Sequence, residues 1–173
     1  MNIQLLPLRE EETIAFKEEM QEAFQQGFQA HFPSEEGNNQ WQVLPDKDFY
    51  QSLNAVGAEA YEALAADGQR VGGAIIVIKA DEHRGELAFL YVKVGVQSKG
   101  IGQTIWKAIE AMHPETKIWE TCTPYFDRRN IHFYINRCGF HAVEFFNEHH
   151  PDPNMPEQFD QEDGLFKFEK VMK

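Results

Sequence analysis

Two glycines lie in a short polar loop, residues 96–104, that follows an apolar run and precedes a helical pattern. At such a strand-to-helix turn the backbone N–H groups and the positive end of the helix dipole converge on an anion, and glycine lets the anion approach the backbone closely. The spacing therefore predicts a phosphate-binding loop. Its residues are Gln97, Ser98, Lys99, Gly100, Ile101, Gly102 and Gln103.

Two common nucleotide-binding motifs do not fit this loop. Gly95 and Gly100 have the spacing of a P-loop, but Ile101 occupies the position of the required lysine and no Ser or Thr follows it. The ligands for the β- and γ-phosphates and for magnesium are therefore missing. A dinucleotide fingerprint needs a third glycine where Ile105 stands. Both interpretations are disfavoured, and a tight turn without a ligand is the structural alternative.

The hydrophobic pattern predicts the elements that hold the loop in place. Apolar residues recur at helical spacing in 11–32 and in 101–112, and 46–56 and 127–140 are two further helical segments. The first apolar stripe runs from Phe16 and Met20 to Phe32, and the second, which is expected to face the core, consists of Ile101, Ile105, Ala108, Ile109 and Met112. Strands are expected at 2–8, twice within 60–80 around the turn "DGQ", and at 85–94, 117–123, 141–150 and 164–173. This order predicts one α/β domain over 1–173 with a mixed central sheet flanked by helices on both faces. The acidic, proline-rich segment 151–164 is expected to be an exposed loop.

The string Gln97-x-x-Gly100-x-Gly102 resembles the acetyl-CoA signature of the GNAT superfamily of N-acetyltransferases. The stretch "NIHFYINRCGF", residues 130–140, is similar to the second hallmark of that superfamily, an Asn followed by an aromatic pair and then Gly-Phe. The expected element order fits the GNAT-type fold over residues 3–172. The resemblance implies an N-acetyltransferase that uses acetyl-CoA as co-substrate and no metal. A primary amine would attack the thioester directly in a ternary complex.

The resemblance also implies how the cofactor is held. Main-chain N–H groups of the loop, with Gln103 at the helix start, would bind the CoA pyrophosphate, and Lys99 would add a charge contact. The strand before the loop would splay from strand 117–123 and lend its backbone to the pantetheine arm. The backbone positions concerned are Leu90, Val92 and Val94, and Asn130 would orient the cofactor or a water.

Acetyl transfer needs a base for the amine and an acid for the departing thiolate. Glu86 stands eleven residues before Gln97, where histone-type members carry a base glutamate, and Glu120 is a second candidate. Tyr134 is the candidate acid. The usual position, four residues before the Gly of Gly-Phe, is occupied by Ile135, so either the helix end contains an extra residue or Tyr134 only packs. In the second case the chain would be a catalytically impaired acyl-CoA-binding or regulatory module.

The composition narrows the range of partners. The chain has 28 acidic and 16 basic residues, a formal net charge of -12, which repels nucleic acid and attracts a cationic amine. No run of residues is long and apolar enough for a membrane span and no secretory signal is visible, so a cytoplasmic protein is expected. The expected assembly is a monomer or a homodimer, as is common for proteins of this size. The resemblance implies that the region containing Phe24, Phe28, His31 and Trp41 covers the acceptor site, and the acids of 151–164 could attract a cationic amine.

Two further groups of residues have reactive side chains. Cys122 and Cys138 are expected to be reduced core thiols, because two isolated cysteines make neither a disulfide framework nor a metal motif. His149, His150 and Asp152 are interpreted as a solvated strand end and not as a metal site, since adjacent strand side chains point to opposite faces.

Overall fold

The computed structural model describes residues 2–31, 42–96, 100–153 and 164–173, with the side chain of His31 excepted. Three sets of predicted site residues lie outside these ranges. They are Gln97, Ser98 and Lys99 of the loop, Trp41, and all but the ends of the acidic segment 151–164.

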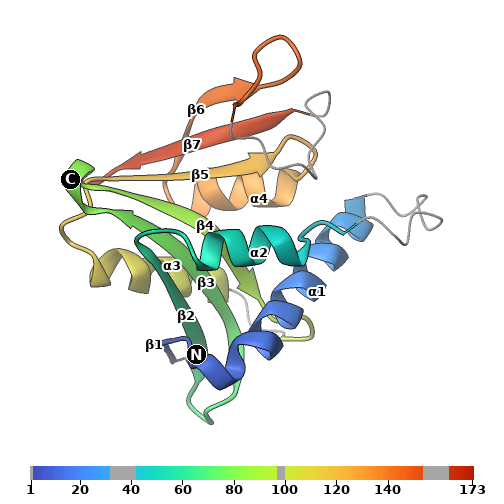
Figure 1. Ribbon diagram of the computed structural model, residues 1–173, viewed down its shortest axis with the longest axis vertical. Helices are drawn as coiled ribbons and strands as arrows, with labels where there is room; N and C mark the ends of the chain where they lie inside the picture. The colour runs from blue at the N-terminus through green and yellow to red at the C-terminus, as the bar shows by residue number, and fades with distance from the viewer. Residues whose placement is uncertain (1, 32–41, 97–99, 154–163) are drawn as a thin grey trace.

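The core of the fold is a seven-stranded sheet in the order β1-β2-β3-β4-β5-β7-β6 (Figure 1). Neighbouring strands are antiparallel except β4 and β5, which are parallel. The strands are β1 (Ile3–Pro7), β2 (Ala58–Ala65), β3 (Arg70–Lys79), β4 (Arg84–Val92), β5 (Ile118–Pro124), β6 (His141–Phe146) and β7 (Leu165–Val171).

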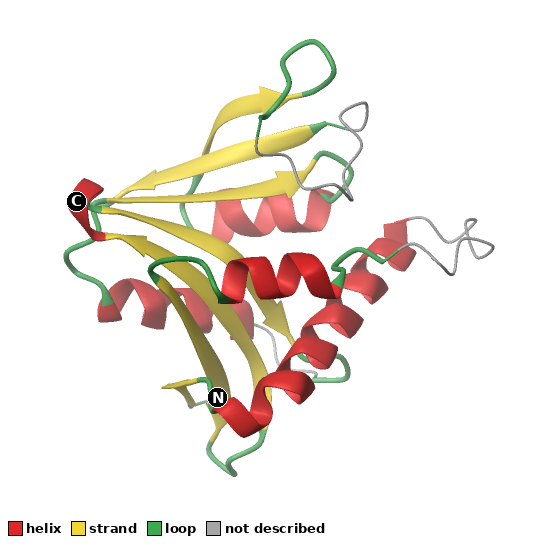
Figure 2. Cartoon of the chain, in the orientation of Figure 1, coloured by secondary structure: helices red, strands yellow, loops and turns green. Residues whose placement is uncertain are grey.

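Helices cover both faces of this sheet, as Figure 2 shows. In that view α1 (Thr13–His31) and α2 (Asp46–Leu53) lie in front of the sheet, and α3 (Ile101–Met112) and α4 (Arg128–His132) lie behind it. A π-helical turn, η4 (Phe133–Arg137), extends α4, and η1 (Glu10–Glu12) and η3 (Ala80–Glu82) are short 3-10 turns. The expected mixed sheet with helices on both faces is thus confirmed. Within the described ranges, no helix is long and apolar enough to cross a membrane.

Each helical layer buries its own apolar cluster. On the α1 and α2 side, Phe16 and Met20 of the predicted stripe are fully buried against the sheet. On the other side α3 buries Ile105 and Ile109 together with Trp106, which lies outside the predicted stripe. Met112 was expected on the buried face, and this was wrong: it is 42% exposed at the helix end. Hydrophobic burial of this kind is the main force that holds both layers to the sheet.

Strands β4 and β5 separate soon after they begin. Their parallel register comprises three residue pairs, from Arg84 with Ile118 to Glu86 with Glu120. Beyond that point the two strands diverge and the sheet opens into a V (Figure 1). A β-bulge lies just past the branch, because Ile76 pairs with Leu87 whereas the preceding residue of β3 already pairs with Phe89.

Candidate functional site: the gap between two splayed strands

The edge of β4 that faces β5 is open beyond Glu86. In the described part of the chain no strand pairs with this edge after the branch, so its N–H and C=O groups can receive an extended ligand as a strand would. The bulge at Ala88 also breaks the alternation of side chains. Ala88 and Phe89 both pack against the α1 and α2 cluster, whereas Leu87 and Leu90 pack against the α3 and α4 cluster. The local bend turns the backbone of β4 at the point where the gap begins.

The strand that was expected to run through Val94 ends at Val92. Val92 packs at the margin of the α3 and α4 cluster, and Val94 lies in a turn closed by a bond from the N–H of Val96 to the carbonyl of Lys93. The predicted backbone positions Leu90 and Val92 therefore lie along the open edge of β4, and Val94 lies just after it.

Gly100 is the N-cap residue of helix α3 and has a φ of 87°. This left-handed conformation strongly favours glycine. The carbonyl of Gly100 accepts bonds from the N–H and the hydroxyl of Thr104, both at 2.9 Å, and among the described residues no side chain caps the helix. The first-turn N–H groups, which an α-helix leaves unpaired, thus point out of the helix at the end of the predicted loop.

Gly102 has a different role from Gly100. A Cβ at Gly102 would lie 3.1 Å from Cζ of Phe133 and 3.6 Å from a methyl of Leu90, so the missing side chain makes room for the ring of Phe133. Beside it, the side-chain amide of Gln103 donates to the carbonyl of Arg137 at 2.8 Å. Glycine at position 102 therefore lets the π-helical turn pack closely on α3.

The π-helical turn explains the position of Tyr134. The N–H of Cys138 bonds to the carbonyl of Phe133 at 3.1 Å, an i to i+5 bond that accommodates one extra residue in the turn. As a result Tyr134 is 7% exposed and points into the core, while Ile135 is 37% exposed. The extra residue that the sequence allowed at the helix end is therefore present, and Tyr134 is also packed in the core.

The Tyr134 ring is held by aromatic neighbours. The ring centroids of Phe133 and Phe140 lie 5.3 and 5.8 Å away, and that of Phe168 lies 6.1 Å away. Burial raises the pKa of Tyr134, and the Thr121 hydroxyl offsets only part of that rise. The phenol therefore keeps its proton at neutral pH, as an acid for a thiolate must.

The helix that presents Tyr134 is capped by Asp127. The carboxylate of Asp127 accepts from the N–H of Asn130 at 3.1 Å and from its side-chain amide at 2.8 Å. Asn130 thus stabilises the first turn of α4 through Asp127, and Gly139 follows the turn with a φ of 87°.

The two candidate bases differ in their surroundings, although they are register partners on β4 and β5. Burial, and then the neighbouring charge of Glu120, raise the pKa of Glu86 against the opposing effect of Lys79. Burial also acts on Glu120, but hydrogen bonds from Lys79 at 3.0 Å and Arg84 at 3.2 Å outweigh it and hold the pKa of Glu120 below its usual range. Glu86 has no ion pair within the described residues. It is therefore the better base of the two.

Cys122 lies on the same face of β5 as Glu120. It is exposed, so the expectation of a core thiol was wrong for Cys122 and confirmed for the buried Cys138; both thiols are free. Loss of water around the sulfur, followed by the charges of Glu86 and Asp152, raises the pKa of Cys122 to about 12 even though the residue as a whole is exposed. The thiol is thus protonated at neutral pH and a poor nucleophile.

Aromatic contacts connect α1 to both arms of the V. Phe24 packs on Phe89 of β4 with centroids 5.8 Å apart, and Phe28 packs on Phe126, just after β5, at 5.7 Å. The predicted acceptor region therefore faces the gap through these two rings.

The histidines at the end of β6 do not form a metal site with the residues that the structure describes. His150 pairs with the carboxylate of Glu144 at 2.8 Å. Among the described residues no group of three His, Cys, Asp or Glu side chains could hold a metal ion.

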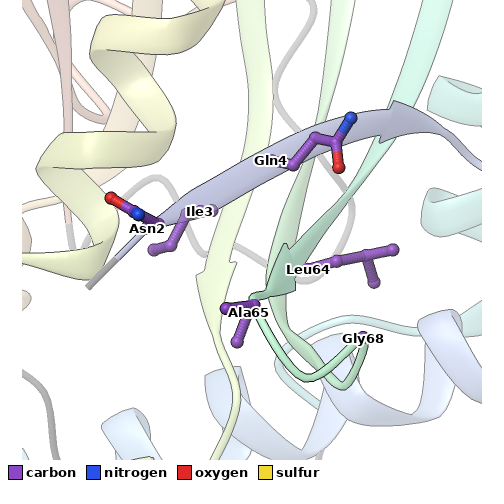
Figure 3. Close-up of a pocket in the computed structure, with 7 residues that line it drawn as sticks. Asn2, Ile3, Gln4, Leu64, Ala65 and Gly68 are labelled. Carbon is purple, nitrogen blue, oxygen red and sulfur yellow. The ribbon is translucent and has the colours of Figure 1, made fainter.

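A shallow pocket elsewhere contains no reactive groups. It lies at the β1 edge of the sheet, where β1 meets the turn after β2, and has a volume of about 270 Å³ (Figure 3). Only apolar and uncharged polar residues line it, among them Ile3, Gln4 and Leu64. Because it contains neither an acid nor a base, we place the candidate site in the gap between β4 and β5.

Comparison with known proteins agrees with this class of α/β fold. The model of the acetyltransferase (GNAT) family matches residues 15–140, and the chain belongs to that family. It is 46% identical over 138 residues to the uncharacterized protein YrkN of Bacillus subtilis (strain 168), which covers 76% of this chain and 74% of that protein.

Solved structures share the fold at low sequence identity. A GNAT family acetyltransferase from Elizabethkingia anophelis with acetyl-CoA bound has a TM-score of 0.69 at 15% identity and covers 99% of both chains. The PaiA N-acetyltransferase from Thermoplasma acidophilum in complex with coenzyme A has a TM-score of 0.67 at 19% identity and covers 99% of this chain and 100% of its own. A Bacillus subtilis acetyltransferase in complex with CoA has a TM-score of 0.64 at 18% identity and covers 99% and 98%.

Proposed function

We propose that this chain transfers the acetyl group of acetyl-CoA to a primary amine, by direct attack in a ternary complex. The observation that supports this most is the open edge of β4, which leaves β5 after three residue pairs and is followed in the chain by the first turn of α3. An extended chain that ends in a diphosphate matches both features. Membership of the GNAT family supports the same conclusion.

Acetyl-CoA would be held mainly by backbone groups. The pantetheine arm would lie along β4 near Leu90, Val92 and Val94, and its amides would pair with the open edge as a neighbouring strand does. The pyrophosphate would bind at the loop 97–99 and the first turn of α3, at Gly100, Ile101, Gly102 and Gln103, where N–H groups and the helix dipole attract an anion. Three proteins of the same fold have CoA or acetyl-CoA bound in their solved structures, which supports acetyl-CoA as the ligand of this chain.

The transfer would need two proton movements. The amine nitrogen attacks the thioester carbonyl carbon and its proton passes to Glu86, directly or through a water. The C–S bond then breaks, and the hydroxyl of Tyr134 gives its proton to the departing thiolate. The raised pKa of each group fits its role, because Glu86 is a stronger base than an ordinary glutamate and Tyr134 stays protonated. Cys122 takes no part in this scheme.

The acceptor would be a small cationic amine or a peptide amine. Leu87 packs on the α3 side, so alternation along the strand puts its neighbour Glu86 on the side covered by α1, where Phe24 and Phe28 flank the gap. The net charge of -12 attracts a protonated amine before its deprotonation at the site.

Thermal unfolding tests the cofactor without knowledge of the acceptor. Acetyl-CoA or CoA at about 100 times its Kd should stabilise the chain by about 2.7 kcal/mol, a Tm shift of about 5–10 °C, whereas ATP should not. Release of free thiol with a panel of primary amines then tests transfer. A Tm shift without thiol release from any amine would favour the alternative of an acyl-CoA-binding module. The absence of any shift would overturn the proposal.

A further inference from the structure

Thr121 has a buried side-chain hydroxyl and lies at the point where β4 and β5 separate. Its side chain is 3% exposed and donates a hydrogen bond of 2.8 Å to the carbonyl of Leu87. Backbone pairing of the two strands ends one residue earlier, at Glu86 and Glu120. The side chain of Thr121 therefore provides the last link between the strands before the gap opens.

Tyr134 packs close to Thr121, on the face of the sheet that carries Phe168. Thr121 lies opposite Phe168 in the register of β5 and β7, and the Phe168 ring packs against that of Tyr134 at 6.1 Å. Burial raises the pKa of Tyr134, and the Thr121 hydroxyl opposes part of that rise, which agrees with two neighbouring hydroxyls. A threonine hydroxyl has one proton and two lone pairs. Because the proton of Thr121 goes to the carbonyl of Leu87, the lone pairs of its oxygen stay available to a neighbouring donor such as the Tyr134 hydroxyl.

We propose that Thr121 is a positioning residue, which aims the Tyr134 hydroxyl into the gap between β4 and β5 and stabilises the tyrosinate that forms during transfer. When Tyr134 gives its proton to the thiolate, the Thr121 hydroxyl turns from the carbonyl of Leu87 to the phenolate oxygen and donates to it. This inference rests on the proposed acetyl transfer. It adds a residue that sequence analysis did not identify. The signal in the sequence was a threonine at a core-facing position of a strand, two residues after the buried Trp119.

The test compares Thr121→Val, which keeps the shape and removes the hydroxyl, with Thr121→Ser, which keeps the hydroxyl. We expect kcat for acetyl transfer to fall at least about 10-fold in Thr121→Val, with the KM for acetyl-CoA within about twofold, since acid catalysis supplies about 100-fold or more. Thr121→Ser should restore most of kcat. The control, Thr116→Val, removes an equally buried hydroxyl before the start of β5 and should leave kcat unchanged.

A spectroscopic measurement separates positioning from simple loss of stability. In protein labelled with ¹³C at the tyrosine Cζ, the Tyr134 signal, assigned by its absence in Tyr134→Phe, should shift in Thr121→Val and return in Thr121→Ser. Full kcat in Thr121→Val, or equal loss in Thr121→Val and Thr121→Ser, would overturn the inference alone. A wild-type chain that transfers no acetyl group would overturn the proposed function and this inference with it.

Discussion

Gly102 offers a direct test of how α3 and the π-helical turn fit together. In Gly102→Ala the new Cβ would lie 3.1 and 3.2 Å from two atoms at the tip of the Phe133 ring, closer than an ordinary contact. Overpacking of this kind costs about 1–3 kcal/mol. The matched control is Gly27→Ala in α1, where a Cβ meets nothing within 4 Å and alanine gains up to about 1 kcal/mol of helix propensity. We therefore expect Gly102→Ala to be less stable than Gly27→Ala by about 2 kcal/mol.

Thermal unfolding measures this difference. For a chain of this size about 2 kcal/mol corresponds to a Tm difference of about 4–8 °C. Phe133→Leu removes the tip of the ring, so Gly102→Ala should cost less in that background, with a coupling energy of about 1 kcal/mol or more. Equal Tm values for Gly102→Ala and Gly27→Ala would refute the packing explanation. If Gly102→Ala instead weakened acetyl-CoA binding at unchanged Tm, Gly102 would serve the ligand and not Phe133.

Three other changes test the site and the fold. Tyr134→Phe should lower turnover at least about 10-fold while acetyl-CoA still raises the Tm; an unchanged kcat would remove Tyr134 from the chemistry. Glu86→Gln should lower kcat and abolish its fall at low pH, because the base acts only when deprotonated and its pKa is raised; a retained acidic limb would point to another base. Glu62, which is fully buried, has its pKa lowered by Arg9 and Arg70 against the effect of burial. Its contribution to stability is therefore present above about pH 4.5 and lost as the pH falls further. In urea unfolding from pH 6 to pH 3, Glu62→Gln should flatten this loss and the exposed Glu18→Gln should not; identical slopes would contradict the assignment.

The order of the elements could be predicted because each one has its own local signal. The stripe from Phe16 to Phe28 and the turn "DGQ" are readable without a tertiary structure, and so is the strand-loop-helix pattern around Gly100. Trp106 was missed because a residue beside the apolar stripe is buried only when a second surface covers it. Phe140 provides part of that surface, with its ring centroid 5.2 Å away.

The geometry of the site could be predicted only in part. Tyr134 stands one residue further from Gly139 than usual, which indicated an irregular helix end, but the π-helical turn is fixed by tertiary packing of the ring. The roles of Glu86 and Glu120 depend on which cations approach them across strands. Arg84 is two residues from Glu86 in the sequence and yet bonds to Glu120, because the parallel register brings the two strands together there. No local pattern encodes that choice.

The central claim is that an acyl-CoA lies along the open edge of β4. Amide hydrogen exchange with and without saturating acetyl-CoA tests it most directly, because a ligand that pairs with this edge must protect its N–H groups. We predict slower exchange in β4 after Glu86 and in the first turn of α3, with no change where β1 meets β2. Unchanged exchange in β4, or protection confined to the pocket at Ile3 and Leu64, would contradict the claim.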